Sequence, residues 1–116
     1  PPTMDAALLT QMSRRGQIKG CIIDGPLALD NAVSPESAHH KGIKSEVAGY
    51  ADILHVPNIE SGNMLAKAIV YFSENKTAGI VLGAAAPVVL TSRADSAETK
   101  LLSIASAVAL AAHQGK

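Results

Sequence analysis

The sequence predicts an α/β protein with three layers, in which a mostly parallel sheet is covered by helices on both faces. Four short segments rich in β-branched residues are continuous apolar runs, as is typical of strands buried on both faces. Segments with helical periodicity separate most of these strands. Twenty alanines stand against two tyrosines, one phenylalanine and no tryptophan. We therefore expect a chain that packs backbone closely against backbone.

The predicted elements follow one another in a simple order. Strands are expected at 18–23, 52–56, 78–82 and 87–90. Helices are expected at 3–14 with Thr3 as a cap, from Pro35 to Gly42 with Ser34 as a cap, at 59–74 with Ser61 capping the main run, and at 96–113. The join between the last two strands is short enough for an antiparallel pair. Residues 1–116 are expected to form one α/β unit.

Composition restricts the classes of partner. Ten basic and ten acidic residues cancel, and no basic run carries interleaved aromatic residues, so we expect no nucleic-acid partner. No apolar stretch reaches the roughly 18 residues that cross a bilayer, and no signal peptide is present. We therefore expect a cytoplasmic protein that does not engage a membrane. The start at Pro1-Pro2 suggests a piece of something longer.

The residues that commonly bind metals are poorly placed for it. Cys21 is the single cysteine, so one chain can form neither a disulfide nor a thiolate cluster, and a buried, inert thiol is expected. His39 and His40 are adjacent and so lie on different faces of their helix. No metal site is expected.

One strand-to-helix junction combines groups that bind anions. Ligands of open α/β sheets gather at the carboxyl ends of the strands. Ser92 and Arg93 lie there, between strand 87–90 and the last helix, where backbone N–H groups, a hydroxyl and a guanidinium can converge on a phosphate-like oxyanion. For Asp95 and Glu98 two interpretations are open. They either form a capping box around the helix start, as Asp95-Ser96-Ala97-Glu98, or take part in catalysis.

Five segments resemble the phosphate acetyltransferase and phosphate butyryltransferase family in sequence, order and spacing: DGPLALD (24–30), ADIL (51–54), PNIESGN (57–63), AGIVLG (78–83) and PVVLTSRAD (87–95). The resemblance runs from about residue 18 to residue 112, and the form of the last segment is closer to the butyryl branch. It implies a fold related to the isocitrate and isopropylmalate dehydrogenases. Their metal-binding spacing of two aspartates four residues apart is missing here.

The resemblance also implies an activity, the transfer of a short acyl group between coenzyme A and inorganic phosphate. Coenzyme A and an acyl phosphate would be substrates, with no permanently bound cofactor. Ser92 and Arg93 match the family's Ser-Arg pair near the reacting groups, and Asn63 is a candidate for the coenzyme A side of the cleft. The acetyl branch has an aspartate that assists thiol deprotonation where this chain has Thr99. Glu98, Asp95 or a group elsewhere would then be the base.

The family's proteins are much longer than this chain. The resemblance therefore implies a carboxy-terminal portion that holds part of an active site, is inactive alone and belongs to a homodimer or a higher homo-oligomer. The alternative is a non-catalytic coenzyme A-binding or interaction module derived from the same fold. The departure at Thr99 is the sequence feature that favours it.

Overall fold

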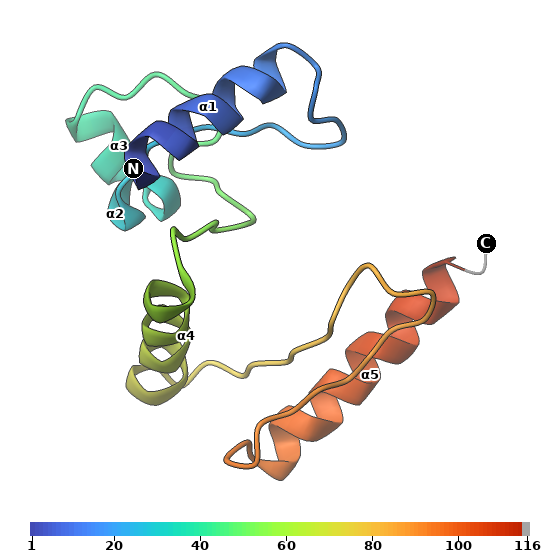
Figure 1. The fold of residues 1–116 in the computed structure, drawn as a ribbon. Helices are drawn as coiled ribbons and strands as arrows, with labels where there is room; N and C mark the ends of the chain where they lie inside the picture. The colour runs from blue at the N-terminus through green and yellow to red at the C-terminus, as the bar shows by residue number, and fades with distance from the viewer. Residues whose placement is uncertain (115–116) are drawn as a thin grey trace. The chain divides into compact units, whose positions relative to one another are not determined.

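The computed structural model of the chain describes residues 1–114 and divides it into two compact units, Pro1–Ile59 and Glu60–Lys116. The first unit contains helices α1 (Pro2–Arg14), α2 (Leu29–Val33) and α3 (Pro35–His40), and the second contains most of α4 (Ile59–Phe72) and all of α5 (Ala97–Gln114). Figure 1 shows long segments without helix between α1 and α2, between α3 and α4 and between α4 and α5, whereas Ser34 alone separates α2 from α3.

In the first unit, α1 holds the extended segment that follows it. The buried Thr10 hydroxyl lies 2.9 Å from the Ala6 carbonyl oxygen and 3.2 Å from the Gly25 carbonyl oxygen. One turn further on, the Ser13 hydroxyl accepts a hydrogen bond of 3.3 Å from the Ile23 N–H. These side chains give the backbone polar groups of the segment partners on a helix, in place of the neighbouring strands of a sheet.

Small residues form the core where α2 and α3 meet. Ala32, Ala38 and Ala48 are buried there. The Gly49 N–H donates to the Asn31 carbonyl at 2.8 Å, and a Cβ added to Gly49 would lie 2.6 Å from the Cα of Pro35. Because Gly49 also has a φ of +89°, this close approach requires glycine.

Asp30 connects α2 to the end of α3. Its Oδ2 accepts a hydrogen bond of 2.5 Å from the Ser37 hydroxyl and pairs with the Lys41 ammonium at 2.8 Å. The hydrogen bond from Lys41, supported by the one from Ser37, lowers the pKa of Asp30 from 3.8 to about 2. The carboxylate is therefore charged throughout the physiological pH range.

In the second unit, residues 76–90 run along α5. The Gly79 N–H donates to the Ser103 hydroxyl at 3.0 Å, and Ser103 is fully buried. Beyond this contact the chain turns at Gly83 and returns, and the Val81 N–H donates to the Val88 carbonyl at 2.8 Å in an antiparallel bridge. The bridge confirms the antiparallel relation predicted for 78–82 and 87–90, at one pair of residues.

The helical predictions were mostly right, with errors at the caps. Helix α1 begins at Pro2 with Pro1 as its N-cap residue, so Thr3 lies inside it and the predicted Thr3 cap was wrong. Ser34 does cap α3, because its hydroxyl accepts the Ser37 N–H at 3.2 Å. Helix α4 begins at Ile59, which places Ser61 inside its first turn and not before it.

The four predicted strands do not form a ladder among residues 1–114, where the Val81–Val88 bridge is isolated. Bends, and a φ of +82° at Gly20, interrupt segment 18–23. A strand is stabilised by hydrogen bonds to neighbours on both sides, and these segments have a helix on one side at most. The three-layer sheet therefore stays a prediction.

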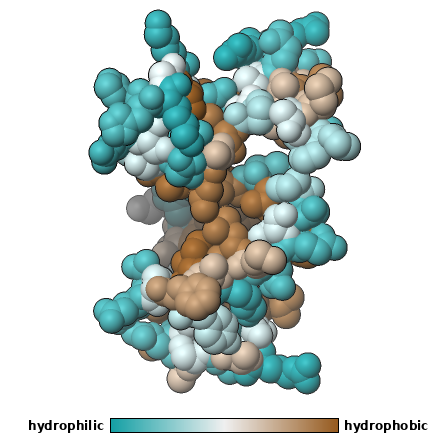
Figure 2. All heavy atoms as spheres, turned by 90° about the vertical axis from the view of Figure 1, so that its left-hand side faces the viewer, coloured by the Kyte–Doolittle hydropathy of each residue, from teal (hydrophilic) through white to brown (hydrophobic). Residues whose placement is uncertain are grey.

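Large apolar side chains lie open on both units. Figure 2 shows brown apolar atoms at the surface. Phe72 at the end of α4 is 91% exposed and Leu82 is 69% exposed. On α5 the open stripe consists of Leu101, Ile104 and Val108, at the spacing of one helix face. Within residues 1–114 this face of α5 is uncovered.

Candidate functional site

A tight turn holds Ser92 and Arg93 just before α5. The Asp95 N–H donates to the Ser92 carbonyl at 3.1 Å, and the Ser92 N–H donates to the Asp95 carboxylate at 2.7 Å. Each end of the turn therefore holds the other, through one backbone bond and one charge-assisted bond. Arg93 lies between the two ends, so its backbone direction is fixed.

The hydroxyl of Ser92 keeps its proton available. Its oxygen accepts the Ala94 N–H at 3.3 Å, and a serine hydroxyl that accepts a bond still has one O–H to donate. The Arg93 side chain is exposed and makes no hydrogen bond or ion pair with any residue in 1–114. A free guanidinium fork beside a free hydroxyl donor suits the oxygen atoms of a phosphate or carboxylate.

The cap of α5 differs from the predicted capping box. Ser96, and not Asp95, is the capping residue, because its hydroxyl oxygen accepts the Thr99 N–H at 3.1 Å. The same hydroxyl donates to the Thr99 side-chain oxygen at 3.1 Å. The box Asp95-Ser96-Ala97-Glu98 was therefore wrong by one residue. The Asp95 carboxylate does not cap the helix because it already accepts the Ser92 N–H inside the preceding turn.

Glu98 lies in the first turn of α5 and has a partner that the sequence did not reveal. Its carboxylate pairs with the Lys76 ammonium at 2.5 Å, and this hydrogen bond raises the pKa of Lys76. Both side chains are more than half exposed. A carboxylate in this position also interacts favourably with the positive end of the α5 dipole.

Asn63 stands apart from these residues. It lies exposed on α4, and within the described residues α4 makes no contact with α5. The structure thus brings Ser92, Arg93, Asp95 and Glu98 together at one end of α5 and leaves Asn63 on a separate helix.

Ser103 and Lys76 are the two residues near this end of α5 that sequence reasoning missed. Ser103 interrupts the apolar positions Leu102 and Ile104, and a serine within such a run is a usable signal for a buried hydrogen bond. Lys76 gave no signal, since its partner lies 22 positions away in the sequence.

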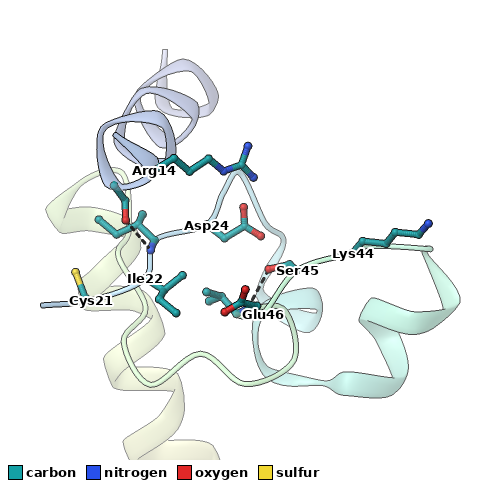
Figure 3. A pocket seen from close by; sticks show the side chains of 10 residues that line it. Arg14, Cys21, Ile22, Asp24, Lys44, Ser45 and Glu46 are labelled. Carbon is teal, nitrogen blue, oxygen red and sulfur yellow. Dashed lines mark hydrogen bonds between the residues drawn. The ribbon is translucent and has the colours of Figure 1, made fainter. Parts of the chain in front are cut away.

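An open pocket of about 580 Å³ lies in the first unit (Figure 3), lined by side chains of both charges. Its lining includes the basic residues Arg14 and Lys44 and the acidic residues Asp24 and Glu46, so it has no net preference for an anion. It contains none of the predicted site residues. Cys21 lies at its edge and is exposed, so the expectation of a buried thiol was wrong. The apolar segment around Cys21 has no neighbouring strand within residues 1–114.

Two features are absent from the described residues. None of their helices has the length and apolar character needed to cross a bilayer. No group of three or more histidine, cysteine, aspartate or glutamate side chains is arranged to bind a metal ion there.

The turn and helix start described above combine a free hydroxyl donor, a free guanidinium and a helix N-terminus, which are groups that bind phosphate-like anions in proteins. The family model for phosphate acetyl/butaryl transferase matches residues 1–109. The chain belongs to this family.

Individual relatives agree with the family match. A phosphate butyryltransferase of Clostridium acetobutylicum is 60% identical over 114 residues, which are 98% of this chain and 38% of the relative. A phosphate acetyltransferase of Thermotoga maritima is 62% identical over 105 residues, 90% of this chain and 36% of the relative. The chain thus spans little more than a third of the length of these relatives. Because both names occur at similar identity, identity does not separate the two branches.

A solved structure also matches. The crystal structure of a branched-chain phosphotransacylase from Enterococcus faecalis V583 superimposes with a TM-score of 0.81 at 39% sequence identity, covering 93% of this chain and 38% of that one.

Proposed function

We propose that the full-length protein transfers a short acyl group between coenzyme A and inorganic phosphate, and that this chain contributes the Ser92–Asp95 turn to the active site. The observation that carries the proposal is the turn itself, which presents a hydroxyl donor and an unpaired guanidinium at the start of a helix. Membership of the phosphate acetyl/butaryl transferase family supports it.

Acyl transfer requires the turn to stabilise the phosphate that leaves. The thiol sulfur of coenzyme A attacks the carbonyl carbon of the acyl phosphate, the bond between that carbon and the phosphate oxygen breaks, and the thiol proton passes to a base. The products are acyl-coenzyme A and inorganic phosphate. Negative charge grows on the departing phosphate, and fixed donors aimed at it lower the barrier. Arg93 would bind two phosphate oxygens with its fork, and Ser92 would donate its hydroxyl proton to a third.

The two acidic residues would have different roles. Asp95 already accepts the Ser92 N–H at 2.7 Å, so its carboxylate is engaged in shaping the turn. Glu98 lies in the first turn of α5, five positions after Arg93, and its carboxylate pairs with the Lys76 ammonium. We assign the base to Glu98 and the holding of the turn to Asp95. Asn63, on α4, remains a proposed contact on the coenzyme A side.

Several properties of the whole protein belong to the same proposal. A three-layer sheet of the isocitrate and isopropylmalate dehydrogenase type would be completed by the rest of the protein. Its strands in this chain would be segments 18–23, 52–56, 78–82 and 87–90. The superposition on a phosphotransacylase supports this. We also propose a cytoplasmic homodimer or higher homo-oligomer, since large apolar side chains lie uncovered.

A second candidate function rests on Thr99. This residue stands where the acetyl branch is expected to carry an assisting aspartate, and its side-chain oxygen accepts the Ser96 hydroxyl in the α5 cap. A protein that lost its base in this way would bind coenzyme A without turning it over.

One pair of assays on the full-length protein separates the two candidates. Thermal-shift titration with coenzyme A measures binding, and a coupled assay measures acyl-coenzyme A formed from butyryl phosphate or acetyl phosphate. The proposal predicts both binding and turnover. Binding without turnover would favour the module, and neither would refute both.

A further inference from the structure

Ser103 makes a pair of buried hydrogen bonds in the middle of α5. Its side chain is 0% exposed. Its hydroxyl donates to the Thr99 carbonyl at 2.7 Å and accepts the Gly79 N–H at 3.0 Å, both within the ordinary range for hydrogen bonds. The first bond lies within the helix, and the second joins the helix to the extended segment that runs beside it.

A second contact fixes the direction of that segment. Lys76 pairs with Glu98, and Gly79 pairs with Ser103. Three extended residues cover about 10 Å, and five helical residues cover about 7.5 Å. The two spans nearly match, so segment 76–79 runs in the same direction as α5 and is held at two points along it.

These contacts involve the two stretches of chain that flank the Ser92–Asp95 turn: α5, which follows it, and the segment from Gly79 to residue 91, which precedes it. On the helix side, Thr99 receives the Ser103 hydroxyl on its carbonyl and donates its N–H to the Ser96 cap. On the other side, the segment that starts at Gly79 continues to the Val81–Val88 bridge, and residues 88–91 lead into the turn. Among residues 1–114, Ser103 is the residue whose side chain hydrogen-bonds both within α5, to Thr99, and to the segment beside it, at Gly79.

We propose that Ser103 is a positioning residue for acyl transfer, setting the placement of Ser92 and Arg93 by locking segment 76–82 to the first turns of α5. The inference rests on the proposed function, because it names how the same site is held. Without the hydroxyl, the Gly79 N–H loses its partner on α5, and the contact that holds the segment to the helix at this point is removed. A misplacement of the order of 1 Å is costly in a reaction that depends on orientation.

The test compares variants in the full-length protein at a temperature where each is folded. Ser103→Ala is expected to lower kcat about tenfold while the KM for coenzyme A changes by less than about twofold. Ser103→Thr keeps the hydroxyl and is expected to recover most of the loss. The control is Ser106→Ala on the same helix, because no side-chain hydrogen bond of Ser106 occurs among the described residues; its kcat is expected to stay within twofold of wild type.

Three results would overturn the inference. One is a Ser103→Ala kcat within twofold of wild type. The second is an equal loss in the Ser106→Ala control, and the third is a loss that merely follows the unfolded fraction. Amide hydrogen exchange at Gly79, measured on the same proteins, needs no turnover. Faster Gly79 exchange in Ser103→Ala supports the lock and unchanged exchange contradicts it. An inactive wild type would instead refute the proposed function.

Discussion

Ser92, Arg93 and Asp95 form a unit in which only some of the polar groups remain available to a ligand. The Ser92 N–H and one Asp95 carboxylate oxygen are occupied by each other. The Ser92 hydroxyl proton and the Arg93 guanidinium stay free within the described residues. The Ser92 hydroxyl and the Arg93 guanidinium, which the proposed acyl transfer requires, are thus the groups that the turn leaves free.

Charge-neutral variants distinguish the roles of the two acidic residues. Glu98→Gln is expected to lower kcat by at least tenfold, since general-base catalysis typically contributes 10²-fold or more. Asp95→Asn keeps an oxygen that can accept the Ser92 N–H, so its kcat is expected to fall only a few-fold. Steady-state kinetics of the full-length protein would check this, and the opposite pattern would reassign the base to Asp95.

Asp30 gives a pH prediction that is independent of catalysis. Hydrogen bonds from Lys41 and Ser37 lower its pKa to about 2. Because the folded pKa lies below the ordinary value of 3.8, the stabilisation is complete above about pH 4 and is lost as the pH falls towards 2. Carboxyl chemical shifts followed by NMR should titrate near 2 for Asp30. In Lys41→Ala the midpoint should move up towards 3.8, and an unchanged midpoint would contradict the assignment.

At the scale of elements, the loop that follows α3 depends on one glycine. Gly49→Ala places a Cβ 2.6 Å from Pro35 at a φ of +89°, which combines a clash with a strained backbone. Gly20→Ala has a similar φ of +82° with no atom within 4 Å, so it isolates the backbone cost of about 1 kcal/mol. We expect Gly49→Ala to destabilise the loop by at least about 2 kcal/mol, read as faster hydrogen exchange over residues 47–51. Equal effects of each variant on its own loop would show that the Pro35 contact is unimportant.

The sequence predicted elements better than it predicted their ends. Helical periodicity located all the longer helices because it depends on local spacing alone. The α5 cap was misplaced by one residue because Asp95 and Ser96 are both good caps, and the choice depended on the bond from Ser92 to Asp95. The strands were predicted as parts of a sheet, and a sheet depends on neighbours that need not lie within residues 1–114.

The candidate site also contains residues that the sequence predicted and residues that it did not. Ser92 and Arg93 were predictable because a strand followed by a polar turn and a helix has a known anion-binding geometry. The partners Lys76 and Ser103 were not, because they reach α5 through contacts between distant parts of the sequence.

For the whole molecule, one explanation accounts for the exposed apolar surface and for the partial coverage of relatives: the rest of the full-length protein covers this surface. Phe72, Leu82 and Leu101 are largely exposed, and the chain spans little more than a third of its relatives. We therefore expect the 116-residue piece alone to show no acyl transfer and to bind a hydrophobic dye such as ANS more strongly, residue for residue, than the full-length protein. Acyl transfer by the purified piece, or weaker dye binding, would contradict this explanation.

The proposed binding of the departing phosphate by Arg93 is best tested by turnover in the full-length protein. Rates of acyl-coenzyme A formation from butyryl phosphate should be measured for wild type, Arg93→Ala and Lys100→Ala, the last removing an exposed charge two positions beyond Glu98 on α5. We expect a loss in kcat of roughly 10²- to 10³-fold for Arg93→Ala and a change of less than twofold for Lys100→Ala. Wild-type turnover in the Arg93→Ala protein would contradict it.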